Sequence, residues 1–302
     1  MEGFFAVLKD SALDSVKILP IIFLVYILIE FMELRESNEK RLKRIFGNRF
    51  SPFFGALIGI VPQCGFSVVA TKLYQGGYIL SGTLIAVYIA TSDEAIPIMF
   101  SRAMTEPSVW SKLGIIIAVK FVYACIVGFL INSFIKKDVK EISEDDDDIE
   151  KNDHGDGCCH HKITGKRDTL KALLVHPLIH SLKIIAYVFV VSFAFGCIVE
   201  LLIGEDKLST FLSSSVWLQP LVSGVVGLIP NCASSVLITE LFCDGYISIG
   251  GALAGLAANS GIGIAVLFKN GSETKKSIII TITTFLLAIL LGYIVTFITV
   301  LI

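Results

Sequence analysis

Two short motifs each place a proline, an amide side chain and a cysteine at successive positions. The first, Pro-Gln-Cys-Gly, occupies residues 62–65, and the second, Pro-Asn-Cys-Ala, occupies residues 230–233. Cysteine thiolates suit soft metals and metalloids, whereas amide and hydroxyl groups supply neutral hydrogen bonds. The two motifs therefore predict a binding site that combines a pair of thiols with neutral polar groups.

The predicted site takes residues from both motifs, from the serines that follow them, and from the polar positions that interrupt a later span in each half. These residues are Pro62, Gln63, Cys64, Gly65, Ser67, Pro230, Asn231, Cys232, Ser234, Ser235, Ser92, Asn259 and Ser260. A single cysteine within an apolar segment is more often a small packing residue. That interpretation stays open for Cys64 and Cys232, and it is preferred for Cys125, Cys197 and Cys243, which lack the motif.

Asp93 and Glu94 lie where the apolar segment 78–100 is interrupted. Carboxylates inside a membrane span are costly and usually functional, so the pair is predicted to carry a coupling proton or to ligate a cation. A helix cap is the structural alternative. Lys120 lies in the next apolar segment, and its counterpart in the second half is Ala288. We expect Lys120 either to be a counter-ion for Asp93 or Glu94 or to extend to the membrane surface.

A polar segment between the halves combines a run of four aspartates at 145–148 with histidines and cysteines. The candidate metal ligands there are His154, Cys158, Cys159, His160 and His161. They lack the paired Cys-x-x-Cys spacing of a closed zinc site, and low apolar content with a charge block is typical of a mobile linker. Weak metal capture and simple solvation both stay open for this segment.

The composition is that of a membrane protein. Of 302 residues, 54% are hydrophobic and only 17% are charged, with a mean hydropathy of +0.76. Soluble domains are nearer half apolar and a quarter charged, and several apolar runs here approach the roughly 20 residues that cross a bilayer. The net charge of −2 does not favour nucleic acid, and the seven cysteines do not favour a secreted disulfide framework. The first ten residues lack the basic region of a cleaved signal peptide.

The second half of the chain repeats the first. The proline motifs lie 168 residues apart, and the same shift places Gly-Tyr-Ile of 77–79 on 245–247 and Thr-Ser of 91–92 on Asn-Ser of 259–260. Agreement at separate points predicts two membrane repeats joined by a linker. The predicted divisions are 1–135, the first membrane repeat; 136–169, the cytoplasmic acidic His/Cys linker; and 170–302, the second membrane repeat.

Each proline motif divides an apolar segment into arms of about ten residues, or about 15 Å of helix, which is half a bilayer. If each segment is a re-entrant hairpin, each half crosses three times and the second half is inverted. The basic loops 34–50 and 269–276 and the linker then share the cytoplasmic side, as the positive-inside rule favours. If each segment crosses fully, the repeats are parallel and the two loops lie on opposite sides. We therefore expect an all-α polytopic membrane protein with two inverted repeats, each of three full crossings and one Pro-broken re-entrant hairpin.

Pro62 and Pro230 are expected to begin the second arm of each hairpin, because proline suits the first turn of a helix. The backbone N–H groups just after them would then be free, and the helix dipole would make a partly positive pocket near the midplane. Irregular backbone at membrane depth persists only inside protein or beside water. Two inverted copies would bring two such helix ends together, an arrangement that recurs in transporters.

The two motifs, the run Thr-Ser-Asp-Glu-Ala-Ile-Pro at 91–97 and the His/Cys-rich linker resemble the ten-span heavy-metal exporter family. Members of that family are described as manganese transporters or arsenic efflux proteins, and they are related to the organoarsenical permeases. The resemblance covers both halves and implies transport. Three crossings and two hairpin arms in each half match the ten spans. Manganese prefers oxygen ligands and trivalent arsenic prefers thiolates, so the motif residues favour a metalloid.

These patterns predict a secondary transporter, not an enzyme, that exports a heavy metal or metalloid with protons through the midplane site. No cofactor is expected. The expected partners are a small inorganic or metalloid substrate and the bilayer of a prokaryotic cytoplasmic membrane, without nucleic acid; a homodimer stays open. The alternatives are a manganese exporter, an importer of a soft sulfur anion such as thiosulfate, and a channel. A membrane enzyme with a cysteine nucleophile is disfavoured because the motif segments hold no histidine to serve as its base.

Overall fold

The computed structural model describes most of both membrane halves. It covers residues 50–142 and 215–301 apart from 64, 93 and 270–273, with the backbone alone over 135–142, and the isolated residues Phe23, Leu178, Leu182, Ala186, Phe189, Val190 and Phe193. Within these ranges the chain forms α-helices joined by turns and contains no strand. The expected first crossing at about 17–32 (apart from Phe23), most of the basic loop after it, and residues 143–169 of the linker lie outside the described residues.

Five helices follow one another in the first half. They are α3 (Ser51–Gly59), α4 (Gly65–Gln75), α5 (Ser81–Ala90), α6 (Ala95–Ala103) and α7 (Ser108–Ile142). The first four are short because two interruptions divide them, one at the proline motif and one at the polar run that contains Glu94. The fifth is long, and its apolar part runs without a break.

The second half contains the same series. Its helices are α10 (Gln219–Gly227), α11 (Cys232–Cys243), α12 (Ile249–Ala258), α13 (Gly263–Lys269) and α14 (Thr274–Leu301). Helices α10 and α12 have both ends 168 residues after those of α3 and α5, and α13 begins 168 residues after α6. The turns before α5 and α12 also match, because each contains a glycine of positive φ, at 73° and 81° respectively.

The prolines of the motifs do not begin the second arms, and that expectation is wrong. Helix α4 begins at Gly65, and α11 begins at Cys232 with Asn231 as its N-cap. The side chain of Asn231 accepts a hydrogen bond from the backbone N–H of Ala233 at 3.4 Å, so this N–H group is not free. An asparagine cap must stand outside the helix in extended backbone, which leaves Pro230 in the turn before it.

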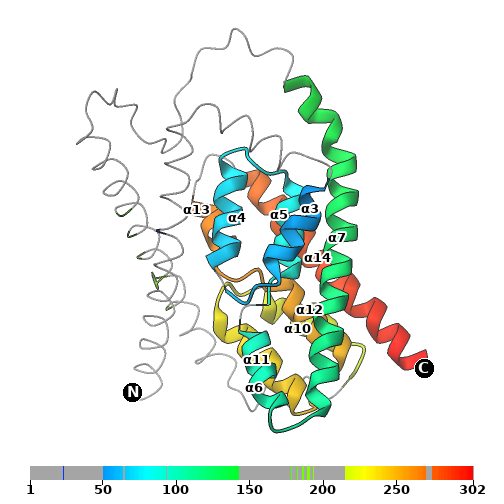
Figure 1. Cartoon of the computed structure of the whole chain (residues 1–302). Coiled ribbons are helices and arrows are strands. Elements are labelled where there is room, and N and C mark those ends of the chain that lie inside the picture. The colour runs from blue at the N-terminus through cyan, green and yellow to red at the C-terminus, as the bar shows by residue number, and fades with distance from the viewer. Residues whose placement is uncertain are drawn as a thin grey trace.

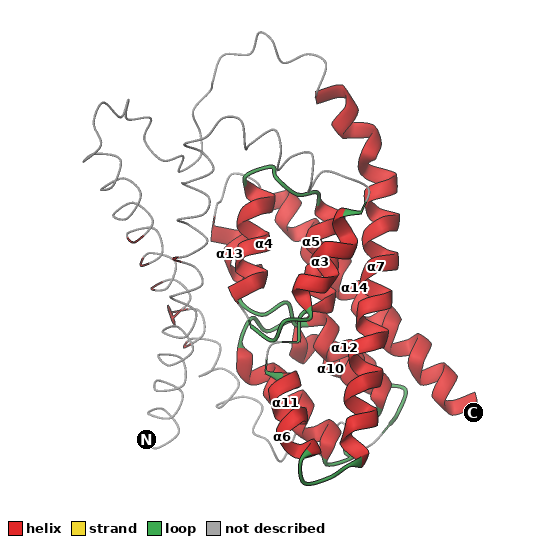
Figure 2. Cartoon of the chain, viewed as in Figure 1, coloured by secondary structure: helices red, strands yellow, loops and turns green. Residues whose placement is uncertain are grey.

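The short helices occupy two halves of the bundle, and the interruptions lie between these halves. Helices α3, α4, α5 and α13 gather in the upper half of Figure 1, and α6, α10, α11 and α12 gather in the lower half. Figure 2 shows connecting loops meeting at mid-height, while α7 runs along one side of the bundle and α14 passes behind it towards the C-terminus. The short arms therefore present their interrupted ends to one another at the centre.

Four helical stretches of the described chain are long and apolar enough to cross a membrane. They are Ser81–Ala103, Ser108–Phe134, Ile249–Lys269 and Thr274–Leu301. The first and third of these contain an interruption, and their 23 and 21 residues are enough for the roughly 30 Å of a bilayer core at about 1.5 Å per residue. The expectation of an all-helical membrane protein is confirmed by this arrangement.

Glycines set how the short helices pack on the long ones. A Cβ atom added at Gly82 of α5 would lie 2.7 Å from the carbonyl oxygen of Gly128 in α7. The equivalent Cβ at Gly250 of α12 would lie 2.6 Å from the carbonyl oxygen of Gly292 in α14. At these two positions the backbones of α5 and α7, and of α12 and α14, are in close contact. The two helix pairs therefore pack in the same register.

The glycine register corrects one expected pairing between the repeats. Gly128 and Gly292 are 164 residues apart, four fewer than the shift that relates the short helices. Lys120, eight residues before Gly128, therefore corresponds to Thr284 and not to Ala288. Both Lys120 and Thr284 are buried, which is expected if they occupy equivalent places on the long helices.

Candidate functional site

The second motif is held against the interruption that follows α12. The side-chain amide of Asn259 donates to Oγ of Ser234 at 3.1 Å, and its carbonyl oxygen accepts from the backbone N–H of Gly261 at 2.8 Å. Oγ of Ser234 in turn donates to the backbone carbonyl of Asn231 at 2.7 Å. These bonds tie the first turn of α11 to the break between α12 and α13. Two of the polar positions predicted from separate segments are therefore in contact.

The first motif helix packs on the second repeat. A Cβ atom added at Gly263, the first residue of α13, would lie 2.9 Å from Cβ of Ser67 in α4. Oγ1 of Thr71 donates to the backbone carbonyls of Ser67 and Gly263, at 2.7 and 3.2 Å. The hydroxyl of Tyr88 in α5 lies 2.6 Å from Oγ1 of Thr71 and completes this buried group. Because Thr71 uses its proton on the carbonyls, the phenol is the donor to Thr71.

Lys120 joins the two repeats at the level of the interruptions. Its ammonium donates to the backbone carbonyl of Thr91, to Oγ of Ser92 at 2.7 Å, and to the backbone carbonyl of Leu256 at 2.8 Å. The residue is only 1% exposed, so the expectation that it extends to the membrane surface is wrong. Asp93, one of the two carboxylates for which Lys120 was predicted to be a counter-ion, lies outside the described residues.

Glu94 stands at the start of α6 as the residue before its first turn, and it is partly exposed. Its side chain makes no capping hydrogen bond to the helix. The helix cap that we considered as the alternative would use Ser92 or Asp93. Oγ of Ser92 donates to the backbone carbonyl of Ala90 at 3.4 Å, and Asp93 lies outside the described residues. Helix α6 is closed at its start by backbone bonds, including the N–H of Ile98 donating to the carbonyl of Glu94 at 3.2 Å.

The other predicted site residues differ in burial. Those that are buried are Gly65, Ser67, Asn231, Cys232, Ser234, Ser235, Ser92, Asn259 and Ser260. Gln63 and Pro230 are partly buried, and Pro62 is exposed. Cys64 lies outside the described residues, as do the linker residues His154, Cys158, Cys159, His160 and His161. The buried set comes from the helix starts and from the second interruption of each repeat.

Two groups at this level are suited to binding. Cys232 is buried and is the first residue of α11, where the partial positive charge of a helix N-terminus favours a thiolate or an anion. Oγ of Ser260 is buried and has no hydrogen-bond partner among the described residues. Those residues also contain no group of three or more histidine, cysteine, aspartate or glutamate side chains placed to hold a metal ion.

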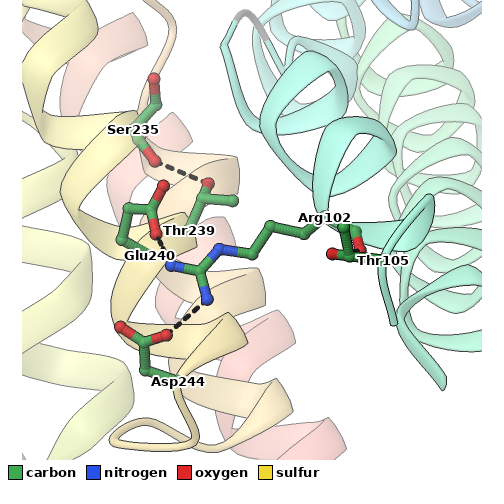
Figure 3. Close-up of polar contacts among 6 residues, drawn as sticks. All are labelled: Arg102, Thr105, Ser235, Thr239, Glu240 and Asp244. Atoms are coloured by element: carbon green, nitrogen blue, oxygen red, sulfur yellow. Dashed lines mark hydrogen bonds and ion pairs between the residues drawn. The ribbon is translucent and has the colours of Figure 1, made fainter. Parts of the chain in front are cut away.

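Sequence reasoning missed the contacts that connect the repeats away from the centre. Arg102 near the end of α6 donates through Nη1 to Oδ1 of Asp244 at 2.5 Å and through Nη2 to Oε2 of Glu240 (Figure 3). The missed residues also include Tyr88 and Thr71. The sequence offered one signal, namely that Arg102 is a charge at the end of an apolar span. It gave no indication of the partners, because these lie 142 and 138 residues away.

Comparison with protein families assigns the chain. The family described as "Putative, 10TM heavy-metal exporter" matches residues 1–182 and 169–300. Comparisons with curated proteins and with solved structures give no match. The family match covers nearly the whole chain and agrees with the apolar helices and with the resemblance of the motifs. The chain therefore belongs to the ten-span heavy-metal exporter family of membrane transporters.

Proposed function

We propose that this protein is a secondary transporter that exports a heavy-metal or metalloid species with protons across a prokaryotic cytoplasmic membrane. The cargo would bind at mid-height, where the four interrupted helices meet. The observation that carries this proposal is the set of contacts between the interruptions: Asn259 with Ser234, Gly263 with Ser67, and Lys120 with both Ser92 and the carbonyl of Leu256. These contacts bring residues of both repeats to one place.

The proposed architecture consists of two inverted repeats with re-entrant hairpins α3–α4 and α10–α11. In its support, both arms of the first hairpin lie in the upper half of the bundle and both arms of the second lie in the lower half (Figure 1). Each arm of about ten residues reaches about 15 Å, half of the hydrocarbon thickness. Helices α5–α6 and α12–α13 would each cross in two pieces, and the linker 136–169 between the repeats would be cytoplasmic.

A cargo site at the interruptions follows from the chemistry of helix ends. Helices α4 and α11 both begin at mid-height, and their aligned peptide dipoles favour an anion or a neutral species rich in oxygen. Irregular backbone at this depth needs a polar or watery surrounding. The buried Oγ of Ser260, which has no partner among the described residues, offers a hydrogen bond to such a cargo. We assign Cys232 and Cys64 as the thiols that would contact it.

Coupling to protons is assigned to Asp93 and Glu94 together with Lys120. Among the described residues, the ammonium of Lys120 donates to three neutral acceptors, one of them in the other repeat. A change of protonation at a neighbouring carboxylate would alter the charge around this ammonium. Because Lys120 bonds both repeats, that change would act on the contact between them. The linker histidines and cysteines would at most collect metal before transport.

The ligand chemistry favours a metalloid over manganese. The motif residues of the two repeats supply two thiols together with hydroxyls and amides, and trivalent arsenic is a soft centre that prefers sulfur. Manganese prefers several hard oxygen ligands, and helix N-termini disfavour a bare divalent cation. Two competing functions remain. The family of heavy-metal exporters leaves a manganese exporter open, and thiols beside helix N-termini would also suit a soft sulfur anion such as thiosulfate.

The test is transport by the purified full-length protein in proteoliposomes with an imposed proton gradient. Arsenite, methylarsenite, manganese and thiosulfate are compared, and we expect one of the two arsenicals to move. Cys232→Ser should lower that flux by roughly tenfold or more, the scale on which metal sites respond to losing one supporting group. Cys125→Ser, a half-buried thiol of α7, is the matched control and should leave it unchanged.

Each competing function gives its own outcome in that experiment. Movement of manganese alone would establish a manganese exporter, and uptake of thiosulfate would establish an importer. If the double variant Cys64→Ser with Cys232→Ser transports at the wild-type rate, the thiols do not bind the cargo. Fluxes far above carrier turnover, insensitive to the proton gradient, would indicate a channel.

A further inference from the structure

We propose that Arg102, Glu240 and Asp244 form a latch that holds the two repeats together at one face of the membrane and must open in each transport cycle. The proposal rests on the proposed function, because a latch between repeats has this meaning only in a protein that alternates its access. The three residues lie in α6 of the first repeat and at the end of α11 in the second.

The guanidinium of Arg102 contacts two carboxylates that lie one helical turn apart, an arrangement that we call the arginine fork. Glu240 and Asp244 are four residues apart and lie on the same side of α11, and the guanidinium of Arg102 reaches across from α6 to both (Figure 3). Charge-assisted hydrogen bonds from a planar guanidinium to two carboxylates are stronger than bonds between neutral groups. One arginine thus ties the two repeats together at two points.

The latch lies at the rim of the molecule and not at the cargo site. Helix α11 begins at the central motif, so Glu240 stands about 12 Å further along its axis, at 1.5 Å per residue. Arg102 is the last residue but one of α6, and α7 starts a few residues later on the same side. Because α7 begins beside α6 and ends at Ile142, within the predicted linker, the latch lies at the end of the bundle opposite the end of α7 that enters the linker (Figure 1).

Only one face carries this set of residues. The shift of 168 relates Glu240 to Lys72, Asp244 to Gly76 and Arg102 to Asn270. Those three residues cannot form an arginine fork between two carboxylates. The equivalent contact between α4 and α13 includes a neutral bond, in which Nε2 of Gln75 donates to the carbonyl of Val266 at 3.3 Å. By the repeat shift, the arginine fork between α6 and α11 has no counterpart at the contact between α4 and α13.

The latch is placed to open. The side chains of Arg102, Glu240 and Asp244 are 33%, 38% and 42% exposed, and exposed ion pairs are individually weak. A second cation from the first repeat faces the same end of α11, since Nζ of Lys112 lies 5.5 Å from the ring centre of Phe242. Such contacts favour the closed arrangement without fixing it, which suits an interface that separates and closes repeatedly.

A native thiol reports the state of the latch. Cys243 immediately precedes Asp244 in the sequence, is the last residue of α11 and is buried. If α6 moves away from α11, we expect this sulfur to become reachable from the side opposite the linker. Reaction with a membrane-impermeant maleimide, located by mass spectrometry of the peptides, measures this opening with the other six cysteines in place. The readout needs no substrate, so it can succeed even if the proposed cargo is wrong.

The experiment compares the wild type, Arg102→Gln, and the exchange Arg102→Glu with Glu240→Arg, all in proteoliposomes. Arg102→Gln should raise the rate of Cys243 labelling from the side opposite the linker by roughly three- to tenfold, the shift expected from losing a weak pair within a network. The exchange should return the rate towards that of the wild type. Glu106→Gln, an exposed acidic residue after α6, is the control and should change nothing.

Equal labelling of Cys243 in the wild type and in Arg102→Gln would overturn the latch. Faster labelling that the charge exchange fails to restore would also overturn it, since the arginine would then act by packing alone. A failure of the transport proposal gives a different result, namely normal latch behaviour with no flux of any tested substrate. If Arg102→Gln does not fold, the exchange variant still decides, because an intact latch predicts that it folds and labels slowly.

Discussion

The two repeats touch through a pair of equivalent interfaces, and these interfaces are built from different chemistry. Helix α4 packs on α13 near the linker side, and α11 packs on α6 at the opposite side. In the first, Gly263 allows the backbone of α13 to approach Ser67 closely. In the second, the residue at the equivalent place is Ala95, which adds a Cβ atom at the start of α6.

The polar contacts of the two interfaces also differ: the first has buried neutral hydrogen bonds and the second has partly exposed ion pairs. Tyr88 and Thr71 form a buried hydrogen-bonded group with the carbonyl of Gly263. At the equivalent positions the second interface has Leu256, which has no hydroxyl, and Thr239, which donates within its own helix to Ser235 at 2.7 Å. The second interface is held instead by the half-exposed charges of Arg102 and its partners. Similar backbones are thus sealed by neutral buried bonds on one side and by a breakable ionic contact on the other.

Lys120 joins the two repeats at the level of the interruptions, and we expect its loss to have the largest effect. Lys120→Met removes the donor to the carbonyls of Thr91 and Leu256, and leaving buried acceptors without partners costs about 1–3 kcal/mol each. Transport in proteoliposomes should fall to background. Thr284→Val, at the equivalent place on α14, is the control and should keep most of the activity. Full transport by Lys120→Met would show that the ammonium plays no part in the cycle.

The close approach at Gly263 predicts the next largest effect. Gly263→Val would place side-chain atoms where a Cβ already meets Ser67 and Tyr88 at 2.9 Å. Overpacking of this kind costs about 1–3 kcal/mol, which should lower the unfolding temperature in detergent. Ala95→Val is the matched change in the other interface and should cost less. Equal losses in both variants would mean that the interfaces are equally tight.

Removing one hydroxyl from each interface compares them more finely. Thr71→Val leaves the hydroxyl of Tyr88 buried without its acceptor, at a cost of about 1–2 kcal/mol in stability. Thr239→Val removes only a bond within α11 and should change stability by less than about 0.5 kcal/mol. Thermal unfolding of the two variants side by side measures the difference. Equal losses of stability in the two variants would contradict the difference between an interface held by buried neutral hydrogen bonds and one held by ion pairs.

Salt should produce the smallest effect, and only at the ionic interface. At 1 M salt the screening length falls to about 3 Å, so the half-exposed pairs of Arg102 weaken while the buried bonds of Thr71 do not. We expect the labelling of Cys243 to rise by roughly twofold in the wild type. The rate in Arg102→Gln should not depend on salt. A similar rise in both would place the salt effect elsewhere in the molecule.

Sequence patterns predicted the parts of this structure that depend on local chemistry. The positions of the interruptions, the membrane class and the shift of 168 residues follow from prolines, polar runs and repeated turns, and the structure has them at the expected places. Gly77 and Gly245, which the shift of 168 residues matched, both have a positive φ, at 73° and 81°, so the structure repeats at this point as the sequence does.

The remaining features depend on contacts that no local pattern contains. Arg102 meets carboxylates 138 and 142 residues away, and several equally plausible partners exist for a charge at a helix end. The counterpart of Lys120 was misplaced because the spacing between short and long helices differs by four residues in the two repeats, and only the glycine contacts show this. The expected role of Pro230 was wrong because Asn231 is the N-cap of α11, so the helix begins after the proline and not at it.

The proposed cargo site is tested by protection of Cys232 from alkylation in the wild-type protein. The substrate that moves in proteoliposomes is added at increasing concentration. The rate at which each cysteine reacts with a membrane-permeant maleimide is measured by mass spectrometry of the labelled peptides. Bound cargo should slow the reaction of Cys232 by roughly tenfold at saturation and leave Cys125 unaffected. A transported substrate that leaves the reactivity of Cys232 unchanged, at concentrations that saturate transport, would show that the cargo passes elsewhere.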